Sequence, residues 1–218
     1  MEQDIVSILK SVGAVYTDDH FVYTSGKHGS VYINKDALYP HTTIASKVGE
    51  MFAEKFKNED IDVVVAPAVG GTILSQWTAY HLSYLKRKEV LSAYTEKDKG
   101  TTASASESEQ IFRRGYDAIV KGKRVLVIED LTTTGISVKK VVDAVKAIGG
   151  KVKAVCVMVN RDPEHVTSDV VGAPFYALGV LKAEAFDEKD CPLCKKGTPI
   201  NNKIGHGKEY LVQLRHQK

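Results

Sequence analysis

Two adjacent carboxylates, Glu129 and Asp130, stand between an apolar run and a polar turn. The run, Val125 to Ile128, predicts a strand buried on both faces. The turn, Thr132 to Gly135, supplies small side chains and exposed backbone N–H groups. Apolar residues then recur at helical spacing from Ile136 onward, so the expected order is strand, acid pair, turn and helix.

This order of residues suits the binding of a phosphorylated sugar. Backbone N–H groups at the start of a helix favour phosphate, and paired carboxylates suit ribose hydroxyls or a divalent metal ion. Such junctions also occur in α/β proteins as plain connections with Thr or Asp caps, so spacing alone leaves both interpretations open. The stretch has neither the Gly-Lys-Ser/Thr of a Walker loop nor the glycines of a dinucleotide fingerprint.

Alternating helix and strand patterns surround this stretch. Helical spacing predicts two helices before the sheet, and short apolar runs predict further buried strands. The helices are expected over Asp4 to Val12 and His41 to Lys57, and the strands over Ile61 to Ala66, Val90 to Tyr94, Val152 to Val159 and Phe175 to Leu181. The alternation predicts an α/β fold with a mainly parallel sheet flanked by helices and a small hood built from the N-terminal segment and C-terminal strands.

Three further polar segments interrupt the pattern. The turn from Pro67 to Thr72 contains Gly70 and Gly71, which permit close approach of a ligand or supply a positive φ. Phe21, Tyr23, Val31 and Ile33 predict a hairpin around a basic turn that holds Lys27 and His28. These two cations either contact an anion or are simply exposed. The stretch from Thr95 to Gln110 is almost free of apolar residues and is expected to be a mobile lid.

Composition excludes several classes of protein. The 218 residues are 43% apolar, which fits one sizeable globular domain, and a formal net charge of +3 argues against a dedicated nucleic-acid binder. No run approaches the roughly 20 apolar residues of a membrane span, and the acidic, amphipathic start differs from a signal peptide. We therefore expect a cytoplasmic protein with no membrane partner.

The three cysteines do not form a disulfide framework. Cys156 lies in an apolar run and is expected to be a small core residue. Cys191 and Cys194 have the spacing of metal ligands, but His206 is the only additional candidate nearby, whereas structural zinc normally requires four ligands. The sequence therefore does not favour a zinc site.

The segment VLVIEDLTTTG closely resembles the 5-phosphoribosyl 1-diphosphate (PRPP) signature of type I phosphoribosyltransferases. PAVGG resembles the loop that contacts the diphosphate in this family. The segments SGKHGS, RRGY and CPLCKKGTP are similar to a divergent branch of its orotate-specific members. The resemblance implies the fold of this family, transfer of a 5-phosphoribosyl group from PRPP to orotate, Mg²⁺ as the cofactor and a homodimer.

The resemblance also implies roles for individual residues. Asp130, Lys97 and Lys99 are expected to be catalytic, and Mg²⁺ is expected to be held through PRPP with Glu129 and Asp130 nearby. Thr133, Arg161 and Lys27 are expected to bind orotate. The residues expected to bind PRPP are Glu129, Asp130, Leu131, Thr132, Thr133, Thr134, Gly135, Ile136, Ser137, Val69, Gly70, Gly71 and Lys97.

Residues 1–218 are expected to form a single domain with a core at about 41–171, a hood from about 1–40 and 172–218, and a lid at about 95–112. Two alternatives share the PRPP signature. A transferase for a purine or uracil does not need Arg161. A non-catalytic PRPP-sensing regulator tolerates a lid with few cations, but it ordinarily carries a separate DNA-binding module, and the sequence contains none.

Overall fold

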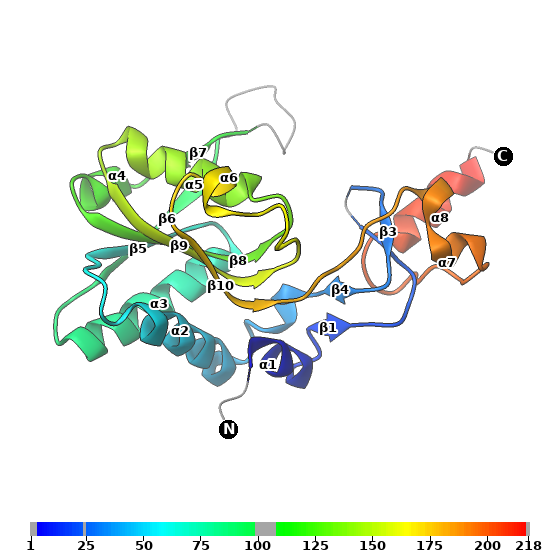
Figure 1. Cartoon of the computed structure of the whole chain (residues 1–218), viewed down its shortest axis with the longest axis horizontal. Helices are drawn as coiled ribbons and strands as arrows, with labels where there is room; N and C mark the ends of the chain where they lie inside the picture. Colours follow the sequence, from blue (N-terminus) through cyan, green and yellow to red (C-terminus); the bar gives the residue numbers. More distant parts are fainter. Residues whose placement is uncertain (1–3, 24, 99–107, 217–218) are drawn as a thin grey trace.

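The computed structural model describes residues 4–23, 25–98 and 108–216, and its centre is a six-stranded sheet (Figure 1). The strand order is β10-β9-β8-β5-β6-β7, and all pairs are parallel except that of β6 with β7. The strands are β5 (Val63–Pro67), β6 (Leu91–Lys97), β7 (Gln110–Phe112), β8 (Arg124–Thr132), β9 (Lys151–Asn160) and β10 (Phe175–Val180). The expected α/β class and mainly parallel sheet are confirmed.

Helices cover both faces of this sheet and bury two apolar cores (Figure 1). Successive side chains of β8 point to opposite faces of the sheet, so Leu126 and Ile128 enter one core and Val125 and Val127 enter the other. The first core is covered by α1 (Ile5–Ser11), α2 (Thr42–Phe56) and α3 (Gly70–Lys86), and the second by α4 (Tyr116–Val120), α5 (Ile136–Ala147) and α6 (Ser168–Val171). Cys156 is fully buried in the first core, as expected.

The hood stands apart from the sheet and combines segments from distant parts of the sequence (Figure 1). Backbone hydrogen bonds join these segments, from Asn201 N–H to His20 C=O (2.8 Å) and from His206 N–H to Val22 C=O (2.9 Å). Its elements and its connection to the core are β1 (Val15–Tyr16), β2 (Phe21–Val22), β3 (His28–Gly29), β4 (Tyr32–Ile33), η1 (Lys35–Ala37), η2 (Glu188–Asp190), α7 (Pro192–Lys195) and α8 (Gly207–His216).

Three details of the expected hood were wrong. The second strand of the hairpin is His28–Gly29, which pairs with Phe21–Val22. Ile33, expected in that strand, pairs with Val15 in a separate antiparallel ladder. The C-terminal part of the hood contains helices where strands were expected, and Pro192 at the start of α7 favours a helix. Helix α1 packs in the first core of the sheet and β10 is an edge strand of that sheet.

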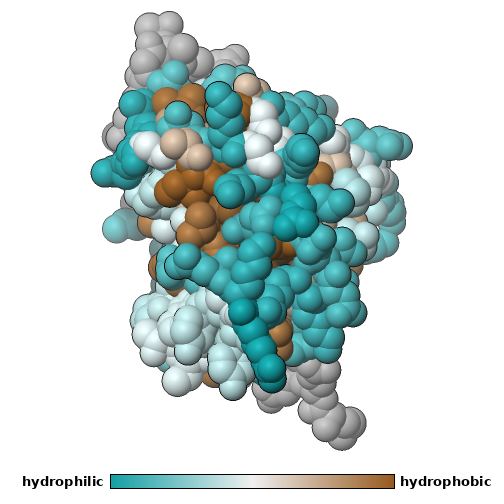
Figure 2. Space-filling model, turned by 90° about the vertical axis from the view of Figure 1, so that its left-hand side faces the viewer, coloured by the Kyte–Doolittle hydropathy of each residue, from teal (hydrophilic) through white to brown (hydrophobic). Residues whose placement is uncertain are grey.

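The molecular face remote from the hood is largely hydrophilic, with an apolar area in its upper half (Figure 2). Within the described ranges, every helix is too short or too polar to cross a lipid bilayer. The carboxyl ends of the parallel strands face the opposite way, toward the hood (Figure 1). Ligands of open parallel sheets bind at these ends, so functional residues are expected there.

Candidate active site

The acid pair lies at the carboxyl end of β8 and is almost completely buried. Glu129 is 8% exposed and its Oε1 accepts a hydrogen bond from the backbone N–H of Asp130 (2.9 Å). Asp130 is 3% exposed, and its Oδ2 accepts hydrogen bonds from Lys35 Nζ (2.7 Å) and from the Tyr39 hydroxyl (2.9 Å). The segment that leaves the hood therefore supplies two partners to Asp130.

Burial and charge shift the pKa values of this cluster. Burial raises the pKa of Glu129 well above its ordinary value, and the negative charge of neighbouring Asp130 raises it further. Burial lowers the pKa of Lys35, but the ion pair with Asp130 and the negative charges of Glu129 and Asp36 together outweigh it, and the net shift is upward. Burial followed by the charge of Asp130 also raises the pKa of Tyr39. Lys35 and Tyr39 thus stay protonated beside Asp130 at neutral pH.

Gly70 and Gly71 allow helix α3 to begin directly against the acid pair. A Cβ atom on Gly70 would collide with Asp130 Oδ2 and lie 2.6 Å from the Tyr39 hydroxyl. A Cβ atom on Gly71 would lie 2.9 Å from the Cβ of Ala66. Neither glycine is among the residues with positive φ, so close approach explains both positions and a left-handed turn does not.

The turn after β8 presents backbone groups at the start of α5. Thr132 Oγ1 accepts a hydrogen bond from the N–H of Gly135 (3.0 Å), and Gly135 has the left-handed φ of 77° that favours glycine. Thr133, Thr134 and Ser137 are exposed. The N–H groups in the first turn of α5 have no intrahelical acceptor, so this end of the helix suits an anion.

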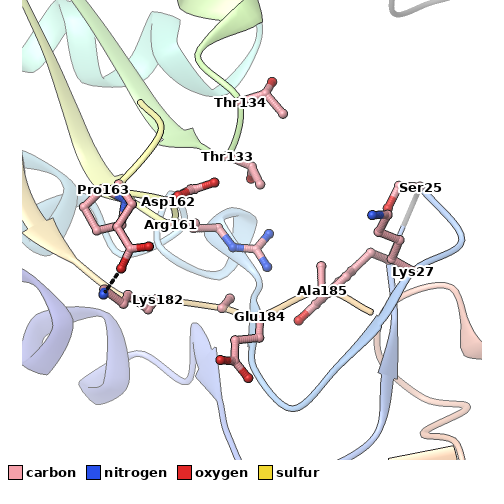
Figure 3. Close-up of a pocket in the computed structure, with 13 residues that line it drawn as sticks. Ser25, Lys27, Thr133, Thr134, Arg161, Asp162, Pro163, Lys182, Glu184 and Ala185 are labelled. Carbon is pink, nitrogen blue, oxygen red and sulfur yellow. Dashed lines mark hydrogen bonds and ion pairs between the residues drawn. The ribbon is translucent and has the colours of Figure 1, made fainter. Parts of the chain in front are cut away.

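A cavity of about 730 Å³ separates this turn from the hood (Figure 3). Thr133, Thr134 and Arg161 line it from the sheet, and Lys27 lines it from the hood. The remaining wall comes from the turn after β9 and from the segment between β10 and the hood, including an ion pair of Lys182 with Glu164 (2.6 Å). The expected orotate-binding residues Thr133, Arg161 and Lys27 therefore surround one cavity.

Arg161 extends its guanidinium from the end of β9 into the space between sheet and hood (Figure 3). Its backbone N–H donates to Thr132 C=O (2.9 Å), which fixes it beside the turn after β8. Its Cζ lies 4.9 Å from the ring centre of Tyr23, and the Tyr23 hydroxyl donates to Val31 C=O (2.6 Å). Arg161 Nε is buried and has no hydrogen-bond partner within the described residues. A planar donor group thus faces the cavity with unused capacity.

The remaining predicted residues lie farther along the same edge. Val69 is 81% exposed and Ile136 is 52% exposed. Lys97 is exposed at the end of β6, where it pairs with Gln110 of β7, so both ends of the expected lid belong to the sheet. Lys99 lies outside the described residues.

Sequence reasoning missed Lys35 and Tyr39 as members of the site. Both belong to the segment INKDALYP, in which a cation and a phenol stand four positions apart at the end of the N-terminal part of the predicted hood. That spacing places them near each other on a helical turn, but the sequence contains no signal that pairs them with an acid more than 90 residues away.

The fold and the cavity define an α/β protein that binds its ligand at the carboxyl edge of a parallel sheet. Residues 34–171 match the family model for the phosphoribosyl transferase domain. The chain is 36% identical to the orotate phosphoribosyltransferase of Thermotoga maritima over 203 residues, which cover 93% of this chain and 98% of the relative. The chain therefore belongs to the phosphoribosyltransferase family.

Solved structures share the fold. The crystal structure of orotate phosphoribosyltransferase from Aeropyrum pernix matches with a TM-score of 0.63 and 24% identity, covering 81% of this chain and 93% of that one. The Mycobacterium tuberculosis orotate phosphoribosyltransferase in complex with PRPP matches with a TM-score of 0.57 and 20% identity, covering 82% and 97%. The expected type I phosphoribosyltransferase fold is confirmed.

Proposed function

We propose that this chain transfers the 5-phosphoribosyl group of PRPP to orotate, giving orotidine 5′-monophosphate and diphosphate. The observation that carries the proposal is the meeting of Thr133, Arg161 and Lys27 around one cavity at the carboxyl edge of the sheet, and the acid pair lies in the strand β8 that leads to Thr133. The names of the relatives that match over nearly the whole chain support the same reaction.

The donor occupies the sheet edge in this proposal. The turn and helix start from Thr132 to Ser137 bind the 5-phosphate through backbone N–H groups. Glu129 and Asp130 hold the ribose hydroxyls, with Leu131 as part of the same strand end. Val69, Gly70 and Gly71 contact the diphosphate, because the absence of side chains on the glycines brings the start of α3 directly against the acid pair.

The donor set of the acid pair fits Mg²⁺. Two carboxylates offer the hard oxygen ligands that Mg²⁺ takes in proteins, and Mg²⁺ usually completes its shell with water and substrate phosphates. Glu129 and Asp130 would hold it together with PRPP. When bound, the ion would neutralise negative charge on the departing diphosphate.

The acceptor lies in the cavity between sheet and hood. The guanidinium of Arg161 presents parallel N–H donors that match the carboxylate of orotate, and Lys27 adds a second cation from the opposite wall. The guanidinium of Arg161 packs over the ring of Tyr23 in a cation–π contact. A base without a carboxylate leaves this guanidinium unpaired.

Positioning and electrostatics supply most of the proposed rate enhancement. The ribosyl C1 develops positive charge as the diphosphate leaves, so water must be excluded until the ring nitrogen of orotate attacks. Lys97 and Lys99 are the proposed cations for the leaving diphosphate. We further propose that the stretch between β6 and β7 closes over the donor to exclude water.

The direct test is diphosphate release from PRPP with a panel of bases. Orotate should give release together with orotidine 5′-monophosphate, while adenine, guanine, hypoxanthine and uracil should give none above background. Release with a purine or uracil in place of orotate would assign a different transferase. PRPP binding without release for every base would assign the regulatory alternative.

The expected homodimer and cytoplasmic location are part of this proposal. Sedimentation equilibrium of the full chain measures the first, and a mass of one chain at micromolar concentration would reject it. Fractionation of the source cells measures the second.

A further inference from the structure

Four side chains that can bind metals converge inside the hood. They are His20, just before β2, and His28, the first residue of β3, together with Cys191, just before α7, and Cys194, within α7. One ligand atom from each residue can be chosen so that all four lie within 4.8 Å of one another. His20, His28 and Cys191 are buried and Cys194 is half-buried, so the cluster is an internal feature of the fold.

The distances between these atoms match the edges of a coordination tetrahedron. His20 Nε2 lies 2.9 Å from His28 Nδ1, and Cys194 Sγ lies 3.3 Å from His28 Nδ1. The sulfur atoms of Cys191 and Cys194 lie 3.8 Å and 3.7 Å from His20 Nε2. Zinc bonds of about 2.3 Å to sulfur and about 2.0–2.1 Å to nitrogen give tetrahedral edges of roughly 3.3 to 3.8 Å. These are four of the six edges, and a shift of a few tenths of an ångström brings the His–His edge into this range, while the other two edges are at most 4.8 Å.

The surroundings orient His20 as a metal ligand. Its Nδ1 lies 2.8 Å from the backbone carbonyl oxygen of Thr198. An N–H on Nδ1 donates to this oxygen and leaves the lone pair of Nε2 directed at the cluster. His28 presents Nδ1 to the cluster and packs its ring edge-to-face with Tyr210, with 5.0 Å between ring centres. Two histidines and two cysteines thus direct four potential donor atoms to one point.

Among the described residues, neither of the two apolar cores extends to the hairpin of the hood or to α7. Phe21 and Val22 are each 1% exposed, yet they belong to neither of the two cores around the sheet. The hairpin contributes only two residues from each strand. Small assemblies of this kind usually depend on a metal or a disulfide for stability.

We propose that His20, His28, Cys191 and Cys194 bind one Zn²⁺ ion that fastens the hairpin of the hood to α7. Two sulfur and two nitrogen ligands in a tetrahedron select zinc over harder cations, and four protein ligands leave no position for substrate. The site is structural. It lies in the hood, and neither the acid pair nor Arg161 belongs to it.

The zinc site also borders the proposed acceptor cavity. His28 follows Lys27 directly, and its backbone N–H donates to Phe186 C=O (2.8 Å), next to Ala185 of the cavity wall. Phe186 N–H donates back to His28 C=O (2.8 Å). Zinc at His28 therefore fixes two adjoining parts of that wall.

The first experiment measures zinc in the full, untagged chain after purification without chelators. We expect about one zinc per chain by inductively coupled plasma mass spectrometry, as for a closed structural site. The Cys191→Ser/Cys194→Ser variant should lose it, and Cys156→Ser is the matched control because Cys156 lies buried in the sheet core. Zinc content that is absent after reconstitution, or equal in the double variant, overturns the proposal.

A second measurement needs no variant and so does not depend on a variant that folds. Cobalt added to the chelator-treated chain should give the intense visible bands of a tetrahedral ion and a near-ultraviolet thiolate band, both removed by one equivalent of zinc. Thiol counting of the denatured chain then separates zinc from a Cys191–Cys194 disulfide. All three cysteines should react, and a count of one without reductant would reject the metal site.

Discussion

The carboxylate of Asp130 has little spare capacity for hydrogen bonds. Its Oδ2 accepts from Lys35 and Tyr39, and its Oδ1 accepts from the backbone N–H of Leu131 (2.7 Å). A carboxylate offers about four acceptor positions, so three are filled. A ribose hydroxyl must take the last position or displace Lys35 or Tyr39. A second contact from the donor to Asp130 would therefore displace a residue that connects the hood to the sheet.

Asp130→Asn should reduce kcat with PRPP by on the order of 100-fold, because the amide keeps the shape but removes the charge. Asp62→Asn is the matched control. Asp62 pairs with Arg124 (2.8 Å) at the opposite end of the sheet, so its loss should lower stability and leave kcat unchanged. Steady-state kinetics and thermal unfolding of both variants provide the test, and equal kcat for Asp130→Asn and wild type would reject the assigned site.

Arg161→Ala should raise the KM for orotate by roughly 10- to 100-fold, the range expected for losing hydrogen bonds to a charged group. The KM for PRPP should change far less. Lys153→Ala provides the control, since Lys153 is an exposed cation near the other end of the same strand. Equal increases in both KM values would count against contact between Arg161 and the base.

Glu129 should make the free protein less stable as pH rises. Its pKa in the folded state is raised above the ordinary 4.5, so the native state binds more protons than the unfolded state above that value. Its contribution is present below about pH 4.5 and is lost as pH rises toward the folded pKa. Wild type should therefore lose stability relative to Glu129→Gln as pH rises above about 4.5.

For comparison, Asp62 should contribute to stability with the opposite dependence on pH, which the Asp62→Asn variant tests. Hydrogen bonds from Arg124 lower the pKa of Asp62 below its ordinary 3.8, so its contribution is present above that value and is lost on acidification. Denaturant unfolding at several pH values measures both differences. A difference for Glu129→Gln that does not depend on pH would contradict the raised pKa of the buried Glu129.

At the scale of elements, the start of α3 is fixed by contact with β8. Gly70→Ala should destabilise the protein by about 1 to 3 kcal/mol, because the added Cβ collides with Asp130 and Tyr39. Helix propensity alone predicts the opposite, a gain of about 1 kcal/mol. Gln76→Ala, at an exposed position of the same helix, isolates the propensity effect. If Gly70→Ala is as stable as wild type with normal kcat, the close approach has no importance.

The sequence predicted the elements of the sheet well, since each buried strand is a short apolar run and each covering helix has a clear apolar face. The exceptions are β7, which lies within the expected lid, the short helices α4 and α6, and the hood. Ile33 alternates correctly for a hairpin with Phe21, but Val15 provides a competing partner that spacing does not reveal. Short strands with few apolar residues have weakly specified register, and for this reason local patterns failed there.

At the scale of the whole molecule, the sheet and the hood should differ in protection from hydrogen exchange. The amides of β8 and β9 lie between two cores and should exchange only through global unfolding. The amides of β2 and β3 should exchange through a local opening of the hood, at lower free energy. Exchange followed by mass spectrometry measures the two regions separately. Equal protection in both would show that the molecule opens as one unit.

The candidate sites show the same limit of sequence reasoning. Thr133 and Arg161 were identified through a resemblance to known motifs, and the parallel order of β8 and β9 brings them together. Lys35 for Asp130, and His20 and His28 for the cysteines, were missed. Their partners lie between 95 and 174 positions away, and no local pattern encodes which distant segments will meet.

The closure of the hood has a consequence for biosynthesis. The hairpin around residues 20–29 leaves the ribosome early, but the segment at 186–206 that completes it follows roughly 160 to 180 residues later, on the order of 10 to 35 s at ordinary rates of translation. The sheet can assemble during that interval, before Cys191 and Cys194 are available to His20 and His28. The proposed acceptor cavity is thus completed last, after the proposed PRPP-binding segment has been synthesised.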